Sequence, residues 1–282
     1  MKRTDLIKHL EGYGCEFLRE GGSHTVYVNR KAKRVSTIPR HREIDENLCR
    51  KICMEKTKAE LDFEQYREYL QREVIRLVEY LSLYRRLHER RKDRLEEMNI
   101  APGFFWVVFE ALFTAIVLWV EKLFSGNSER GLVDFLAFCE RNLWIFGIKE
   151  LQRRRGYQNG HWMLERTPII TMESVREDMK RVQNLPSLRS FKLRRDKFHA
   201  HFDKDYFFDS KKLAVDAPLK RSDLEEIVTV IDEILNRYSA AYDGNCSSLK
   251  TWTATDVDYL LDDLHSYRLE TNRNGQGAAQ PQ

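Results

Sequence analysis

The chain has 282 residues, of which 33% are charged, 42% are hydrophobic and 11% are aromatic. This composition excludes a disordered chain and a collagen-like one, because it supplies enough apolar surface for a core. The formal net charge is only +4, but residues 1–60 hold 14 basic and 9 acidic side chains, a net +5, and the remaining residues carry a net charge of −1. The length predicts two domains, and the charge distribution predicts that the basic one comes first.

The cysteines indicate a reducing compartment. There are five, with no C-x-x-C pair: Cys15, Cys49, Cys53, Cys139 and Cys246. An odd number without that spacing is typical of cytosolic thiols rather than of a disulfide framework. The opening M-K-R-T-D-L-I-K has no apolar stretch after its basic residues, so we expect no secretory signal and a cytoplasmic protein.

Residues 1–57 predict a small α-β-β-β-α module. Thr4 is the expected N-cap of a helix that ends near Gly12, and Asp45 is the expected cap of the closing helix. Alternating and β-branched residues predict the strands, which are expected over residues 15–19, 25–28 and 35–38, before Pro39.

Residues 58–269 predict an all-α domain, which makes the fold class of the whole chain α+β. Apolar residues recur at spacings of three and four from Phe63 to about Asn99 and predict one long amphipathic helix. Further helices are expected over residues 104–120, 172–182 and 188–201. Three more helices are expected to begin at a cap in residues 125–128, at a capping box that starts with Ser222, and at Thr255. Residues 270–282 have no apolar anchor and are expected to form a disordered tail.

The segment from Phe104 to Val120 is apolar apart from Glu110 and Thr114. A membrane-spanning helix needs about 20 apolar residues, and a central carboxylate costs about 2.5 to 3.5 kcal/mol on insertion scales. We therefore predict that this segment is the central helix of a bundle, buried on all sides. A membrane-attached protein is the alternative.

The N-terminal module carries the string Gly21-Gly22-Ser23-His24-Thr25-Val26-Tyr27, followed by Val35-Ser36-Thr37-Ile38-Pro39-Arg40-His41. With the opening Arg3-Thr4-Asp5-Leu6-Ile7-Lys8, these residues resemble the HicA family of mRNA interferase toxins over about residues 1–58. The resemblance implies a fold like the double-stranded-RNA-binding domain, a ribonuclease activity on translated messages, a catalytic role for His24 and a HicB-like antitoxin as partner.

The residues themselves are compatible with that chemistry. Cleavage of RNA without a metal needs a group of near-neutral pKa to move the 2′-hydroxyl proton, and histidine is the side chain that has one. Gly22 and Ser23 are candidate RNA-binding residues, because backbone N–H groups and a hydroxyl can hold a phosphate. The alternative is that His24 is an ordinary exposed strand residue. His41 is a weaker candidate that would shape the loop after the third strand.

A second constellation is Arg195-Asp196-Lys197-Phe198-His199-Ala200-His201-Phe202-Asp203. Arg195, the polar Asp196 and His201 match the short R-x(4–6)-H signature of HEPN domains. The helical setting resembles the abortive-infection branch of that superfamily over about residues 60–242. The resemblance implies a dimeric, metal-independent ribonuclease in which Arg and His of both protomers line one cleft.

The choice of histidine in this motif is open on geometric grounds. At 100° per residue, Arg195 and His199 lie about 40° apart on a helix, whereas Arg195 and His201 lie about 120° apart. His201 is the better match to the family pattern, if the helix loosens near Ala200 or the site is assembled across a dimer, and His199 is the reserve. The alternative is a solvated basic helix end with two ordinary histidines.

Together these features predict an RNA-cleaving toxin or abortive-infection effector that acts on mRNA or tRNA and needs no metal or other cofactor. A non-catalytic RNA-binding protein, with the helical domain used for dimerisation or sensing, is the competing class. Neither a Walker loop nor zinc-ligand spacing is present in the sequence, so nucleotide-driven or metal catalysis has no support.

Overall fold

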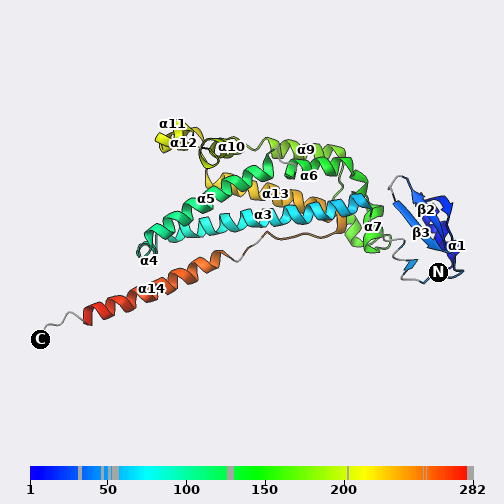
Figure 1. The fold of residues 1–282 in the computed structure, drawn as a ribbon, viewed down its shortest axis with the longest axis horizontal. Coiled ribbons are helices and arrows are strands. Elements are labelled where there is room, and N and C mark those ends of the chain that lie inside the picture. Colours follow the sequence, from blue (N-terminus) through cyan, green and yellow to red (C-terminus); the bar gives the residue numbers. More distant parts are fainter. Residues whose placement is uncertain are drawn as a thin grey trace. The chain divides into compact units, whose positions relative to one another are not determined.

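The computed structural model describes residues 1–30, 34–45, 48, 49, 52, 57–125, 130–201, 203–249, 251 and 253–277. A small antiparallel sheet near the N-terminus is followed by a helical region (Figure 1), which confirms the predicted α+β class. The elements are α1 Arg3–Gly12, β1 Glu16–Glu20, β2 His24–Asn29, β3 Arg34–Pro39, α3 Lys58–Arg90, α4 Leu95–Met98, α5 Pro102–Phe124, α6 Leu132–Arg141, η1 Leu143–Phe146, α7 Ile148–Arg155, α8 Trp162–Arg166, α9 Met172–Gln183, α10 Leu188–Arg194, η2 Arg195–His199, α11 Lys204–Phe208, α12 Ser210–Asp216, α13 Arg221–Asp243 and α14 Ala254–Gly277.

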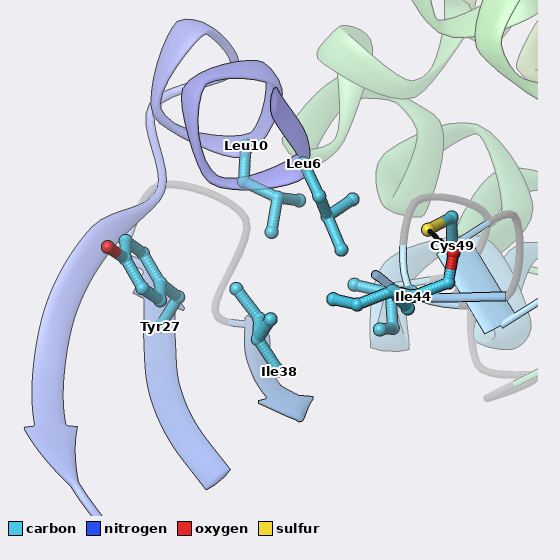
Figure 2. Packing of buried hydrophobic residues seen from close by; sticks show 7 residues of the cluster. Leu6, Leu10, Tyr27, Ile38, Ile44 and Cys49 are labelled. Atoms are coloured by element: carbon cyan, nitrogen blue, oxygen red, sulfur yellow. Dashed lines mark hydrogen bonds between the residues drawn. The ribbon is translucent and has the colours of Figure 1, made fainter. Parts of the chain in front are cut away.

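The N-terminal module is built on a meander of three strands in the order β1-β2-β3. The first residue of β2, His24, pairs with Pro39 of β3, and Glu20 of β1 pairs with Thr25. The module has its own buried cluster, formed by Leu6, Leu10, Tyr27, Ile38, Ile44, Cys49 and Ile52. Figure 2 shows the leucines of α1 pointing toward Tyr27 and Ile38 of the sheet. Burial of these side chains fixes α1 on one face of the sheet.

The first helix does not begin as predicted. Its N-cap is Lys2, which makes no side-chain cap hydrogen bond, and Thr4 lies inside the first turn. Backbone pairing holds the start of the chain instead, because the Arg3 N–H donates to the Arg42 carbonyl at 3.1 Å and the Ile44 N–H donates to the Met1 carbonyl at 2.9 Å. The Asp45 cap was predicted correctly, since its carboxylate accepts from the Leu48 N–H at 3.2 Å.

The described chain forms two compact units. The first comprises Met1–Tyr66, Arg141–Ile170 and Tyr238–Asn245, and the second comprises Arg67–Glu140, Thr171–Arg237 and Cys246–Gln282. The boundaries of these units differ from the predicted domain boundary at residue 57, because helical segments from later in the chain join the first unit. The division into 1–57, 58–269 and 270–282 stays a prediction from the sequence.

A buried carboxylate organises the helical part of the first unit. Glu60 has 0% exposure and accepts hydrogen bonds from the Thr57 N–H at 2.7 Å, from the Thr57 hydroxyl at 2.9 Å and from Arg154 Nη1 at 2.8 Å. It also pairs with Arg153. Burial favours a raised pKa for Glu60, but the Thr57 and Arg154 hydrogen bonds and the charge of Arg153 outweigh it and lower the pKa below its usual value.

The predicted burial of the apolar helix α5 is only half correct. Its second half holds the buried Ile116, Val117 and Val120, but in its first half Trp106 is 66% exposed. By length and composition α5 could cross a membrane, and 28% of its most apolar window is buried. An apolar sequence specifies that a face avoids water, but it does not specify that the same chain covers that face.

Several predicted helix ends also change. The long helix α3 ends at Arg90 rather than near Asn99, and the short α4 precedes Pro102, which opens α5. Helix α13 begins at Arg221, where the Asp223 carboxylate accepts from the Lys220 N–H at 2.8 Å, so Ser222 lies within the first turn. The cap predicted at 125–128 lies largely outside the described residues.

Residues 270–277 were predicted as the start of a disordered tail, but they continue α14 to Gly277. Residues 278–282 lie outside the described residues.

The Glu60 cluster gives a stability prediction. Replacing Glu60 by Ala leaves Arg153 and Arg154 without their buried partner, so we expect the free energy of unfolding to fall by about 3 to 5 kcal/mol. Urea denaturation measures this loss. The matched control is Asp62→Ala on the exposed side of the same helix, which should change stability by less than about 0.5 kcal/mol.

The contribution of Glu60 to the free energy of unfolding should depend on pH with a defined sign. Because the folded pKa of Glu60 lies below the usual 4.5, its contribution is present above pH 4.5 and is lost as the pH falls through the lowered pKa. The difference between wild type and Glu60→Ala should therefore shrink in acid. A difference that is small at pH 7, or that grows in acid, would contradict this role.

Candidate functional site

The turn between β1 and β2 presents three of the predicted site residues together. Gly22, Ser23 and His24 are consecutive and exposed. The Gly21 N–H donates to the His24 carbonyl at 2.8 Å, which closes the turn tightly. A Cβ atom on Gly21 would lie 3.1 Å from that carbonyl oxygen, so the closure favours glycine at this position. The turn therefore holds His24 at the start of β2, where the residue is exposed to solvent.

Two arginines that sequence reasoning did not assign to the site lie beside this turn. Arg40 donates through Nη2 to Glu20 Oε2 at 2.7 Å and to the Gly21 carbonyl at 2.8 Å, and its N–H donates to the Ser23 carbonyl at 3.3 Å. Arg3 donates to the Thr25 hydroxyl, which in turn donates to Glu20 at 3.1 Å. The hydrogen bond from Arg40 is the main cause of a lowered pKa of Glu20, and burial acts in the opposite direction.

The register explains why Arg40 reaches the turn. His24 pairs with Pro39, so the next residue after β3 comes level with Ser23. The signal that could have identified Arg40 is its place directly after the strand-ending proline. His41 is exposed and, among the described residues, makes no side-chain hydrogen bond or ion pair. The structure therefore brings Gly22, Ser23, His24 and Arg40 together, and among the described residues no side-chain hydrogen bond or ion pair joins His41 to them.

The second candidate site lies at the end of α10, where the helix changes its hydrogen-bond pattern. Residues Arg195–His199 form a π-helical turn, and the Ala200 N–H donates to the Arg195 carbonyl at 2.8 Å. The helix does loosen at Ala200, which is the condition on which the sequence favoured His201. Single π turns inside helices occur frequently at functional sites. Angles based on 100° per residue do not apply beyond Arg195.

Arg195 is held by carboxylates on two sides. Its Nη1 pairs with Glu121 of α5, and its Nε donates to Asp196 Oδ1 at 2.7 Å. Glu121 is buried, and this burial raises its pKa, although the charge of Arg195 acts in the opposite direction. Arg195 thus pairs with its neighbour Asp196, and the catalytic role of both residues stays a prediction. Glu121 was missed, because it lies in an apolar segment 74 residues earlier in the chain.

His199 faces the helix bundle rather than solvent. Its Nδ1 lies 3.0 Å from the Thr114 hydroxyl of α5, its ring meets the Phe113 ring at 5.8 Å, and its Nε2 is buried without a hydrogen-bond partner among the described residues. Burial, with a smaller contribution from the charge of Arg194, lowers the pKa of His199 to about 4. At neutral pH this ring is therefore an uncharged part of the packing.

His201 lies just beyond the π turn and is exposed. In the described part of the chain its side chain makes no hydrogen bond or ion pair, and none joins it to Arg195. Around it, Lys197 Nζ pairs with Asp203 Oδ2 at 2.7 Å, and Asp203 caps α11 by accepting from the Asp205 N–H at 3.1 Å. This pair spans the segment that carries His201, so the histidine is accessible on a segment fixed at both ends.

The described residues form no cluster of metal-ligating side chains. No group of three or more His, Cys, Asp or Glu side chains gathers there in a way that could hold a metal ion.

These observations define a class of protein: an α+β module with an exposed histidine turn, joined to a helical domain with an R-x5-H motif on a π turn. The family model for the HicA toxin of bacterial toxin–antitoxin systems matches residues 3–59, and the HEPN model for AbiU2 matches residues 60–267. The second match covers more than half of the chain, so the chain belongs to the AbiU2 family of HEPN proteins. No match was found among curated proteins or among solved structures.

Both matched families are generally ribonucleases. The chain accordingly has the domain composition of a ribonuclease-type effector of toxin–antitoxin or abortive-infection systems.

The environment of His199 gives a titration prediction. We expect its imidazole to remain neutral from pH 8 down to pH 5 and to titrate with a midpoint at about 4. Two-dimensional NMR of the imidazole nitrogens measures this, and the His199→Gln variant assigns the signal. A midpoint above 6 would contradict the buried placement of the ring.

Proposed function

We propose that this chain is a metal-independent endoribonuclease that acts as a toxin or abortive-infection effector. The observation that supports this most strongly is the turn at Gly22, Ser23 and His24. These three residues are exposed, and the guanidinium group of Arg40 lies beside the turn. An accessible imidazole next to a planar cation is the minimal equipment for moving a proton and holding a phosphate.

In the proposed reaction, His24 accepts the proton of the 2′-hydroxyl. That oxygen then forms a bond to the adjacent phosphorus, and the bond from phosphorus to the 5′-oxygen breaks. The 5′-oxygen leaves with a proton supplied by water or by a protonated imidazole, and the products are a 2′,3′-cyclic phosphate and a 5′-hydroxyl. The Ser23 hydroxyl and Arg40 would hold the phosphate, because both are hydrogen-bond donors beside the turn.

For the helical domain we propose a second site formed by Arg195, Asp196 and His201. The contacts of His199 support His201 as the proton-transfer group, since His199 is partly buried and bonded to Thr114, whereas His201 is exposed. Within one protomer no hydrogen bond or ion pair joins His201 to Arg195. We therefore propose a homodimer in which His201 of one protomer completes the site of Arg195 in the other.

The remaining parts of the proposal concern the cellular setting. The substrate would be messenger or transfer RNA, and a HicB-like antitoxin would cover the N-terminal module until it is released. The protein would act in the cytoplasm, where those RNAs are found.

The first site is tested by replacing His24 in a chain whose second site is already inactivated. In a His201→Ala background, we expect His24→Ala to lower the rate of RNA cleavage in EDTA by about 100-fold or more, which is the usual contribution of an acid–base group. Gel analysis of end-labelled RNA measures the rate. The control is His9→Ala, an exposed histidine on α1, in the same background. An unchanged rate in the His24 variant would refute its role, and RNA binding without any turnover in wild type would favour a non-catalytic RNA-binding protein.

The second site is tested in the reverse background. With His24→Ala present, His201→Ala should abolish the remaining cleavage, whereas His199→Ala should retain it if the variant stays folded, which its melting temperature reports. Mixed dimers of Arg195→Ala and His201→Ala chains should regain part of the activity, because one composite site is restored. Activity lost with His199 and kept without His201 would reverse the assignment, and a monomer in sedimentation would refute the shared site.

A further inference from the structure

A pocket of about 740 Å³ lies in the second unit, outside the sites described above. It is formed by the end of α3, by α4 and by the first half of α5. Its most informative lining residues are Tyr84, His88, Arg91, Trp106, Phe109 and Glu110. The volume falls within the range of about 300 to 1,000 Å³ that is usual for small-molecule sites.

The walls of this pocket are aromatic. Phe109 meets Tyr84 edge-on at 6.1 Å and His88 edge-on at 5.1 Å, and Tyr84 meets Phe113 at 5.7 Å. Burial, followed by the charge of Arg91, lowers the pKa of His88, so its ring is neutral at pH 7. Trp106 is 66% exposed at the rim. Planar rings on the walls and at the rim suit a planar aromatic ligand.

The lining contains two side chains of opposite charge that form no ion pair with another described residue. Four other arginines at this end of α3 are paired with carboxylates: Arg85 with Glu225, Arg86 and Arg90 with Asp258, and Arg94 with Asp262. Arg91 forms no ion pair with a described side chain, and neither does Glu110 of α5. The pocket thus offers one cation and one carboxylate among its aromatic rings.

The pocket shares a wall with the R-x5-H turn. The Phe113 ring lines the pocket. The centroid of the same ring lies 5.8 Å from the centroid of the His199 ring and 5.5 Å from the guanidinium carbon of Arg194. A ligand bound against Phe113 would therefore lie next to the segment that carries Arg195 and His201.

We propose that this pocket receives a nucleobase of the RNA substrate, with guanine preferred. The base would stack on Trp106 at the rim, as bases stack on aromatic side chains in single-strand recognition. The Glu110 carboxylate, which is acceptor-only when ionised, would take the two adjacent donors of guanine, N1–H and the 2-amino group. Arg91 would hold the phosphate attached to the same nucleotide.

This inference names the substrate specificity of the proposed ribonuclease and rests on that function, but nucleotide binding can be measured without cleavage. The full-length chain is titrated by calorimetry with GMP, AMP, CMP and UMP, and with single-stranded RNA octamers that contain one guanine or none. GMP should bind at one site per chain and about tenfold more tightly than the other nucleotides, since a good bidentate pair discriminates bases by about 1 to 3 kcal/mol.

Single substitutions then locate the site. Glu110→Gln should remove the preference for guanine, and Trp106→Ala and Arg91→Ala should each weaken GMP binding by about tenfold. The matched controls are Lys92→Ala, an exposed cation next to Arg91, and Trp162→Ala, a tryptophan with 58% exposure in the other unit. Tighter binding of the guanine octamer than of GMP would identify RNA as the source of the base, and equal binding would identify a free nucleotide.

The failures of the two proposals are distinguishable. If wild type cleaves RNA but no nucleotide or octamer binds, or binding is unchanged in Trp106→Ala and Glu110→Gln, the pocket assignment is wrong and the ribonuclease stands. If these variants only dissociate a dimer in sedimentation, or only lose binding to lipid vesicles, the pocket is an interface or a membrane contact. If guanine binding behaves as expected but no RNA is cleaved, the pocket stands and the ribonuclease proposal fails.

Discussion

Two polar side chains on the apolar helix α5 hold the π turn of the R-x5-H motif. Glu121 pairs with Arg195, and Thr114 bonds to His199, so both ends of the turn are fixed to the same helix. A buried carboxylate without a partner is costly, and the pair therefore strongly favours the arrangement that brings Arg195 to it. The wider hydrogen-bond spacing of the π turn places His199 inward and leaves Ala200 and His201 at the surface. The accessibility of His201 is in this sense a consequence of the two contacts on α5.

The N-terminal module also exposes its candidate histidine, His24, but it does so through a turn between two strands. Its histidine is exposed because it follows the turn closed by the Gly21–His24 hydrogen bond, and the sheet register brings Arg40 level with that turn. The buried cluster beneath the sheet contains no charged side chain. Stability and site are therefore separate in this module, since the turn residues take no part in the core. In the helical domain they are coupled, because the same ion pair that positions Arg195 also satisfies buried Glu121.

Local sequence patterns were sufficient to predict the strands and to select the motif residues. The alternation at residues 25–28 and the proline at 39 predicted the strands, and the motif residues Arg195 and His201 were found by their spacing. The contacts of those residues could not be predicted in the same way. Glu121 and Thr114 lie in a segment whose composition indicates only burial, and their partners come about 80 residues later, so no local periodicity links them. A π turn differs from an α turn only in its hydrogen-bond register, which a pattern of apolar residues does not encode. The exposed first half of α5 was missed for a related reason, because apolar residues look the same whether their cover is the same chain or a ligand.

The ion pairs also constrain how each arginine can meet a phosphate. The Arg40–Glu20 pair has both side chains about half exposed, at 49% and 52%, and such pairs contribute little, so a phosphate can replace the carboxylate at small cost. Arg195 differs, because Glu121 is 7% exposed and would be left buried and unpaired if its arginine turned away. The exchangeable partner of Arg195 is instead Asp196, whose side chain is 39% exposed. An incoming phosphate would therefore take the Nε and Nη2 edge now held by Asp196, while Nη1 stays on Glu121. Arg195 would therefore approach a phosphate from a fixed direction, which is set by Glu121 of α5 rather than by the ligand.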